Sequence, residues 1–225
     1  MRNLRPTKLA IVDYGLGNLF SVKQACEHVG IQASITASKH ELLHADAVIL
    51  PGVGAYGNAM EALHKLDIVS VLQEVVAAGT PLVGVCLGMQ LLMTESYEFG
   101  RYKGLGIIPG SVVRLDQPVE GSRVLKVPHI GWNRLRAARP WPNTLLGDIA
   151  DNEYMYFVHS YITQPEDPGI ILSTSRYGHI EFCSCLGFRN IFACQFHPER
   201  SGAQGLKIYR NLAQHLRHAV QGDMA

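Results

Sequence analysis

A cysteine flanked by glycines stands between a short apolar run and a helical pattern. Gly84 and Gly88 enclose Cys86, after the apolar residues 81–83. Glycines let the backbone turn sharply, which would expose the cysteine over the start of the helix as in a nucleophile elbow. The positive end of the helix dipole favours a thiolate at that point. The pattern indicates a nucleophile, and the alternative is a small buried cysteine beside packing glycines.

A histidine and a glutamate two positions apart could complete such a site. His197-Pro198-Glu199 follows the apolar run 191–196. Proline favours extended backbone in the residue before it, and in an extended chain positions i and i+2 point to the same side. Glu199 could then orient the imidazole while its other nitrogen faces the thiol, a triad in the order Cys, His, Glu. The alternative is a strand-end histidine beside a solvated glutamate, but the cysteine elbow upstream favours catalysis.

Donors for a developing oxyanion could come from the segment 51–54, Pro-Gly-Val-Gly, which ends an apolar strand. Its glycines permit amide groups to turn towards a neighbouring strand, and parallel strands end at one crevice. Gln90 lies one helical turn after Cys86 and would project on the same side, towards a substrate. It could also be an ordinary residue of the helix surface.

Two further patterns suggest ligands that the rest of the sequence disfavours. Residues 52–57 match G-x-G-x-x-G, but the acidic residue that should follow about 20 positions later at a strand end is missing. That offset falls at Gln73 and Glu74, inside a helical run. Cys183 and Cys185 supply only half of a tetrahedral zinc site, so strand packing is the better interpretation. We therefore expect no nucleotide, no metal and no cofactor.

Composition excludes several classes of protein. The 225 residues include 20 basic and 19 acidic side chains, a formal charge of +1 that gives no case for a nucleic-acid binder. No apolar run approaches the length of a signal-peptide core or a membrane span. The five cysteines are odd in number and scattered, which is typical of a reducing compartment. We expect a cytoplasmic protein without disulfides.

The order of elements predicts an α/β fold. Apolar strands at 8–13, 32–36, 46–50 and 81–85 alternate with helical patterns at 19–29, 55–66 and 68–78. Later strand-like segments follow one another with turns between them, and a helix closes the chain: 112–115, 124–127, 154–162, 170–174, 190–196 and the helix 203–220. We expect one domain over residues 1–225, with its core at about 8–215 and an open, mostly parallel mixed sheet.

Six separated motifs occur in an order that resembles one family. They are residues 13–19, 51–54, 84–90, 128–133, 156–161 and 195–199. The chain resembles the class I, triad-type glutamine amidotransferases, and among them the glutaminase subunits of imidazole glycerol phosphate synthase. The resemblance covers about residues 8–215. It implies a flavodoxin-like fold with helices on both faces of the sheet.

The resemblance also assigns roles to residues. Cys86 would attack the side-chain amide of L-glutamine, giving a glutamyl thioester and ammonia. His197 would act as base and then as acid, oriented by Glu199. The remaining matches are the oxyanion residues Gly52, Val53 and Leu87 and the glutamine-binding residues Gln90, Glu98, Ser160 and Tyr161.

The implied partner is a cyclase subunit with a (β/α)8 barrel, in a heterodimer. It would receive ammonia through a channel and make imidazole glycerol phosphate and an aminoimidazole carboxamide ribotide in histidine biosynthesis. Asn18, Trp132 and Tyr156 match positions at or near that interface, although Trp132 could equally be a half-buried core aromatic. Arg200 stands where the family usually has lysine, and the two cations are not interchangeable at a specific contact.

Two alternatives stay open from the sequence. A paralogous glutaminase could supply ammonia for an amidinated sugar of a surface polysaccharide. A non-catalytic regulatory subunit could use the same fold, since a fold does not determine function. The presence of the cysteine, the histidine and the glutamate favours an enzyme.

Overall fold

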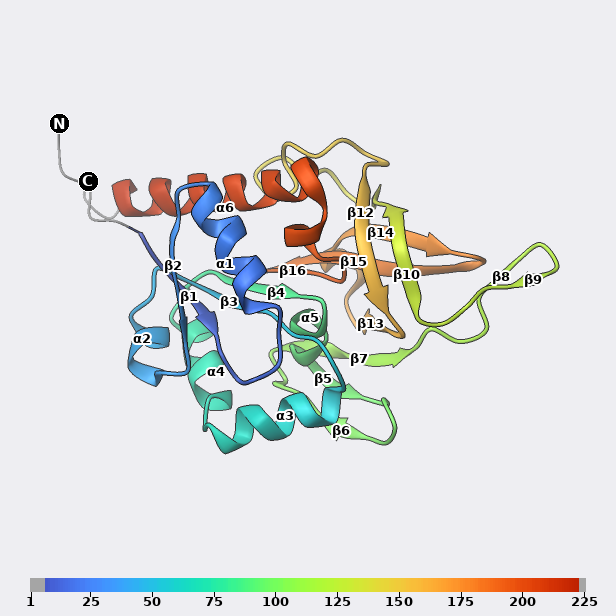
Figure 1. Ribbon diagram of the computed structural model, residues 1–225, viewed down its shortest axis with the longest axis horizontal. Coiled ribbons are helices and arrows are strands. Elements are labelled where there is room, and N and C mark those ends of the chain that lie inside the picture. Colours follow the sequence, from blue (N-terminus) through green and yellow to red (C-terminus); the bar gives the residue numbers. More distant parts are fainter. Residues whose placement is uncertain (1–6, 223–225) are drawn as a thin grey trace.

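The computed structural model describes residues 7–222 and has an eight-stranded mixed sheet at its centre (Figure 1). Five strands are parallel, in the order β2-β1-β3-β4-β16, which is the flavodoxin-like arrangement. Their bounds are β1 Lys8–Val12, β2 Gln32–Thr36, β3 Ala47–Leu50, β4 Leu82–Val85 and β16 Ile191–Cys194. The sheet continues antiparallel beyond β16 through β15 Ile180–Phe188, β14 Ile171–Tyr177 and β11 Arg136–Ala137. The predicted mixed α/β sheet is confirmed.

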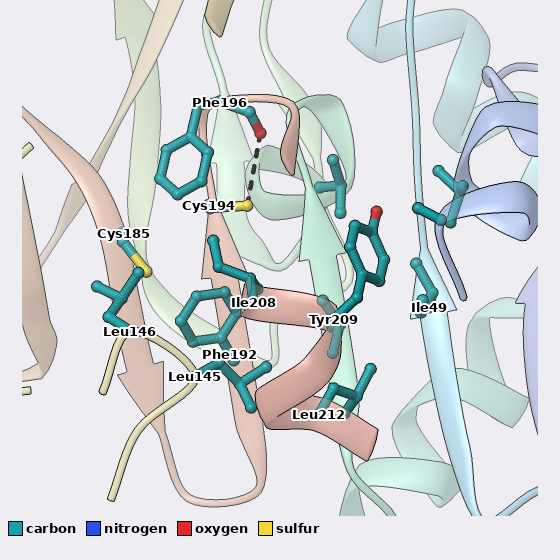
Figure 2. Packing of buried hydrophobic residues seen from close by; sticks show 14 of the residues in the cluster. Ile49, Leu145, Leu146, Cys185, Phe192, Cys194, Phe196, Ile208, Tyr209 and Leu212 are labelled. Atoms are coloured by element: carbon teal, nitrogen blue, oxygen red, sulfur yellow. Dashed lines mark hydrogen bonds between the residues drawn. The ribbon is translucent and has the colours of Figure 1, made fainter. Parts of the chain in front are cut away.

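Helices cover both faces of the parallel strands, which explains why four of these strands are largely apolar. The exception is β2 at the edge of the sheet, which also carries exposed polar residues. On one face α1 (Leu19–His28) and α6 (Gly202–Gly222) contribute to a single buried cluster. Figure 2 shows part of this cluster, where Ile208, Tyr209 and Leu212 of α6 lie beside Phe192 and Cys194 of β16. The other face is covered by α2 Lys39–Leu43, α3 Tyr56–Lys65, α4 Val69–Ala77 and the short α5 Leu87–Leu91.

Smaller sheets pack beside the main one. A four-stranded sheet has the order β13-β7-β5-β6, and two hairpin-like pairs join β10 to β12 and β8 to β9. The bounds are β5 Met93–Ser96, β6 Tyr102–Lys103, β7 Ile108–Arg114, β8 Val119–Glu120, β9 Arg123–Val124, β10 His129–Arg134, β12 Tyr154–His159 and β13 Tyr161–Pro165. Two 3-10 helices, η1 (Pro168–Ile170) and η2 (Pro198–Arg200), complete the elements.

Some boundaries expected from the sequence are wrong. The apolar run 154–162 is two strands that part at Ser160, because β12 pairs with β10 whereas β13 pairs with β7. Of the run 124–127 only Val124 belongs to a strand, in the short pair of β8 and β9. The helix α2 was not expected; its start is capped by Ser38, whose side chain accepts a hydrogen bond from the Glu41 amide.

The parallel strands direct four segments to one edge of the sheet. Tyr14 follows β1, residues 51–54 follow β3, Cys86 follows β4, and His197 follows β16. Because β1, β3, β4 and β16 run in the same direction, their carboxyl ends meet at this edge. Residues more than a hundred positions apart in the chain therefore converge there.

Candidate active site

Cys86 occupies a sharp turn between β4 and α5. Its backbone has φ 54° and ψ −110°, a conformation rarely adopted by non-glycine residues. The turn is held by the Cys86 amide, which donates to the Cys194 carbonyl at 2.8 Å. A Cβ on Gly88 would overlap the Leu50 carbonyl oxygen, and one on Gly84 would have three neighbours at 3.1 Å. The glycines are thus required by close packing, and the predicted elbow is present.

His197 and Glu199 form a buried pair. Nδ1 of His197 lies 2.8 Å from Oε1 of Glu199, and the two side chains are 4% and 1% exposed. The reason that we gave for this contact from the sequence is wrong. His197 is extended (φ −103°, ψ 96°), but Pro198–Arg200 is a 3-10 helix rather than a continuing strand. The helical turn brings the carboxylate back to the imidazole.

The pKa of His197 reflects both its burial and its neighbours. Burial alone would lower the pKa, but hydrogen bonding and charge from Cys86 and Glu199 raise it to about 10. Nε2 is buried and has no hydrogen bond of ordinary geometry within residues 7–222. Glu199 occupies the Nδ1 side, so Nε2 is the nitrogen available to the Cys86 thiol. Such contacts are often loose without substrate and tighten when it binds.

A cavity of about 330 Å³ contains both the thiol and the imidazole. Gly52 and Glu199 are not among the residues that line it. The other residues that we expected to catalyse, bind substrate or stabilise an oxyanion do line the cavity. The complete lining is Val53, Gly54, Cys86, Leu87, Gln90, Glu98, Pro128, Val158, His159, Ser160, Tyr161 and His197. The site can therefore hold a small polar molecule against a nucleophile and a protonated imidazole.

Two of the expected substrate-binding side chains are already fixed by the protein. Gln90 is 5% exposed, and its amide nitrogen donates to the Tyr161 carbonyl and to Oε1 of Gln195, each at 3.0 Å. It is not an ordinary helix-surface residue. Oε2 of Glu98 accepts a hydrogen bond from the Tyr56 amide at 2.7 Å, and burial raises the pKa of the Glu98 carboxyl.

Two further buried side chains, Gln195 and Tyr14, lie beside these groups and were not expected from the sequence to have a role. The Gln195 amide nitrogen lies 3.8 Å from the Cys86 sulfur. The buried Tyr14 hydroxyl donates to the Pro51 carbonyl at 2.8 Å, and a Cβ on Gly52 would overlap that hydroxyl. Both residues belong to recognised motifs, and their polar groups directly follow buried strands, which was the available signal.

A second histidine, His159, also lines the cavity. Its Nδ1 lies 3.0 Å from the Tyr161 carbonyl, and its Nε2 lies 3.0 Å from Nδ1 of His129. Burial lowers the pKa of His159 to about 3 and that of His129 to about 4. Both rings are neutral at neutral pH, so the pair serves to hold the segment that carries Ser160 and Tyr161.

The residues expected at a partner interface lie on the surface. Trp132 and Tyr156 face each other across β10 and β12, with ring centroids 6.0 Å apart. Trp132 is 55% exposed, so its interpretation as a core aromatic is wrong. The Arg200 guanidinium lies 5.5 Å from the centre of the Tyr156 ring. Asn18 precedes α1 and accepts a hydrogen bond from the Ser21 hydroxyl at 2.9 Å.

Cys183 and Cys185 are buried within β15, as expected of strand packing. Burial raises the pKa of Cys183 to about 12. In the described part of the chain, no three His, Cys, Asp or Glu side chains are grouped as metal ligands.

Across residues 7–222, no helix combines the length and apolar character needed to cross a membrane.

Comparison with known proteins identifies the family. Residues 10–216 match the family described as glutamine amidotransferase class-I. The chain is 46% identical over 209 residues to the imidazole glycerol phosphate synthase subunit HisH of Geobacter sulfurreducens, covering 92% of this chain and 99% of that one. The chain belongs to the class-I glutamine amidotransferases, in the HisH family. HisH of Moorella thermoacetica is 41% identical to this amidotransferase, with 96% and 98% of the two chains covered.

Solved structures of other amidotransferases share the fold. Thermotoga maritima PurLQS matches with a TM-score of 0.73 at 18% identity, covering 94% of this amidotransferase and 99% of that chain. The glutaminase domain of Trypanosoma brucei CTPS with bound acivicin matches with a TM-score of 0.67 at 16% identity, with 94% of each chain covered.

Proposed function

We propose that this chain is the glutaminase subunit of an imidazole glycerol phosphate synthase, with Cys86, His197 and Glu199 as its catalytic triad. Membership of the HisH family gives the overall activity, the hydrolysis of glutamine for histidine biosynthesis. The observation that supports the residue roles is the meeting of an elbow cysteine and a buried His–Glu pair at one cavity.

In the first half of the reaction, the Cys86 thiolate attacks the carboxamide carbon of glutamine and forms the C–S bond. The negative charge that develops on the amide oxygen is stabilised by backbone amides of Leu87 and of Gly52–Val53. His197, protonated near neutral pH, gives its proton to the amide nitrogen. The C–N bond then breaks, leaving ammonia and a glutamyl thioester.

In the second half, water attacks the thioester carbonyl while the now neutral His197 accepts a proton from it. The C–S bond breaks, and its electron pair returns to the sulfur as thiolate. Glutamate leaves, and the imidazolium is restored. Glu199 keeps the ring oriented with Nδ1 protonated in both halves.

Substrate recognition follows from the cavity lining. The free oxygen of Glu98 would meet the α-ammonium group of glutamine, while its other oxygen stays on the Tyr56 amide. Gln90 supports the cavity wall through its bonds to Tyr161 and Gln195, and Ser160 and Tyr161 also line the cavity.

The ammonia would pass to a cyclase subunit with a (β/α)8 barrel, through a channel that keeps it from water. The exposed Trp132 and the half-buried Tyr156, together with Arg200 and Asn18, would contact that subunit. We further propose that residues 1–225 form one amidotransferase domain, with its core at about 8–215, that acts in the cytoplasm as half of a heterodimer.

Replacing Cys86 tests the proposal. Cys86→Ala should lower glutamine-dependent synthesis by about 10⁴-fold or more, since the nucleophile is lost. Synthesis by the paired complex from added ammonium salt should stay within about twofold of the wild type, because ammonia bypasses the thiol. Loss of both reactions would indicate structural damage, and retention of glutamine-dependent synthesis would exclude Cys86 as the nucleophile.

A further inference from the structure

Two buried polar atoms behind the triad lack hydrogen-bond partners. Oε1 of Glu199 bonds His197, but within residues 7–222 its other oxygen, Oε2, is buried without a partner. The hydroxyl of Tyr209 in α6 is likewise buried without a partner within the described chain. A carboxylate oxygen only accepts hydrogen bonds, and a phenol can donate one. The two atoms are chemically complementary, and leaving both unpaired would be costly.

The packing of α6 against η2 places Tyr209 on the helix face that is turned towards Glu199. Gly205 precedes Tyr209 by one helical turn, so the two residues share a face of α6. That face is pressed against η2, because a Cβ on Gly205 would overlap the carbonyl oxygen of Pro198. Pro198 adjoins Glu199 in the chain. In Figure 2 the Tyr209 hydroxyl points away from Leu212, which lies one turn later on the same helix.

Electrostatics agree with this placement. Burial raises the pKa of Tyr209 strongly, and the charges of Glu199, Cys26 and Cys194 raise it further. These three groups come from η2, α1 and β16, the elements packed around the ring. Burial also raises the pKa of Cys194, with Glu199 as the next cause. The charge of Glu199 therefore acts on two groups at the core side of the triad, the Cys194 thiol and the Tyr209 hydroxyl.

We propose that Tyr209 is a positioning residue for the catalytic triad, its hydroxyl donating through one bridging water to Oε2 of Glu199. The water would accept from the phenol and donate to the carboxylate, and the Cys26 sulfur offers a weak third partner. This extends the triad to Cys86–His197–Glu199–Tyr209, and it rests on the function proposed above for those first three residues. Tyr209 does not touch substrate and acts only through Glu199.

The expected effect on chemistry has a definite direction. A hydrogen bond to a carboxylate withdraws negative charge from it and makes it a weaker acceptor. Without the bond from Tyr209, Glu199 would hold the shared proton of His197 more tightly. The pKa of the His197–Glu199 pair would rise, and His197 would become a weaker acid towards the departing ammonia.

Tyr209→Phe tests this with little change in packing, because the ring is kept. We expect kcat for glutamine hydrolysis to fall about three- to tenfold, with KM changed less than about twofold. The basic limb of the kcat pH profile should move to higher pH by roughly 0.3 units or more. The midpoint of urea unfolding should fall, because a satisfied buried hydrogen bond is lost.

Tyr177→Phe is the matched control. Like Tyr209→Phe, it removes one tyrosine hydroxyl and keeps the ring. Tyr177 lies in β14, and its hydroxyl donates a hydrogen bond to the Lys126 carbonyl at 2.9 Å. The control substitution should leave kcat and the basic limb unchanged.

Several outcomes would overturn the inference. An unshifted basic limb in Tyr209→Phe, with kcat equal to the wild type, would mean that the hydroxyl does not act on Glu199. A higher urea midpoint would mean that the hydroxyl is truly unpaired. A parallel change of kcat and KM without a pH shift would indicate damaged packing. If the wild-type chain paired with the cyclase subunit releases no glutamate from glutamine, the proposed function fails instead.

Discussion

At the scale of single residues, the catalytic role proposed for His197 depends on whether its imidazole is protonated. The pKa of this imidazole is raised to about 10 against the effect of its burial, by the Cys86 thiol on one side and Glu199 on the other. A protonated ring is the acid that the departing ammonia needs. The neutral pair His129–His159 beside the cavity shows the opposite case, in which burial lowers both pKa values.

This pKa predicts a loss of activity at high pH. The kcat for glutamine hydrolysis should decline as the pH rises towards about 10, where His197 loses its proton. Glu199→Gln removes the charge that raises the pKa, so the decline should begin at lower pH, together with a loss of kcat. A pH–rate profile with the same basic limb in both proteins would contradict the assignment.

The same shift predicts a change in stability. The folded-state pKa of His197 lies above its ordinary value of 6.5, so its protonation stabilises the folded state. This contribution is complete below about pH 6.5 and is lost as the pH rises through about 10. Urea unfolding midpoints measured from pH 6 to 10 should fall less steeply in Glu199→Gln than in the wild type.

At the scale of elements, the segment after β3 is held between two neighbours. Gly52 lies against the Tyr14 hydroxyl on one side, and its Cβ position is 3.0 Å from Cβ of Leu87 and 3.2 Å from the Gly88 amide on the other. Tyr14 also fixes the preceding carbonyl of Pro51. Only glycine fits at position 52 without displacing this segment, and the orientation of the Gly52 and Val53 amides therefore depends on it.

Gly52→Ala should displace this segment and weaken the oxyanion site. We expect kcat to fall about 10²-fold or more, the usual cost of losing one such donor, with a smaller change in KM. Gly147→Ala is the control, since the nearest atom to a Cβ there is a carbonyl oxygen 3.2 Å away, remote from the cavity. Equal kcat values in Gly52→Ala and the wild type would show that these amides do not stabilise the transition state.

Elements also differ in how far the sequence predicts them. The parallel strands β1, β3 and β4 were predictable because helices bury both of their faces, which makes them short, largely apolar runs. The run 154–162 was expected as one strand, but it divides at Ser160 into β12, which pairs with β10, and β13, which pairs with β7. This division depends on tertiary strand pairing, which the local sequence does not indicate. Strand β10 was not expected. Its two large apolar residues, Ile130 and Trp132, face solvent, so the strand lacks the buried apolar face from which the other strands were predicted.

The site was predictable to a similar extent. Cys86 and the histidine were evident from glycine spacing and proline position, whereas the contact between His197 and Glu199 arises from a 3-10 turn. Gln195 and Tyr14 could not be assigned, since the position of a side chain relative to Cys86 or Pro51 depends on how strands are ordered in the sheet.

At the scale of the whole molecule, the strand order brings the proposed catalytic groups together. Strand β16 is formed late in the chain but inserts beside β4, which places the end that carries His197 next to Cys86. The same end of the molecule carries the β10–β12 pair, where Trp132 stands exposed beside Tyr156 and His159 lines the cavity. A partner bound to that pair would lie close to the point where ammonia is released.

Trp132→Ala should therefore weaken partner binding more than chemistry. An exposed aromatic at the centre of an interface commonly contributes 2 kcal/mol or more, so the Kd for the cyclase subunit should rise about 30-fold or more. The glutaminase activity of the isolated chain should stay within about twofold of the wild type, since Trp132 does not line the cavity. Isothermal titration calorimetry measures the first quantity, and an unchanged Kd would exclude Trp132 from the interface.

The most direct test of the central claim is to find which thiol reacts with a glutamine analogue. The full chain would be treated with 6-diazo-5-oxo-L-norleucine, digested and mapped by mass spectrometry, with glutamine as a competitor. Cys86 should carry a single adduct, labelling should be suppressed by glutamine, and His197→Ala should slow it. An adduct on Cys26, Cys183, Cys185 or Cys194, or labelling of Cys86 that glutamine does not suppress, would contradict the account.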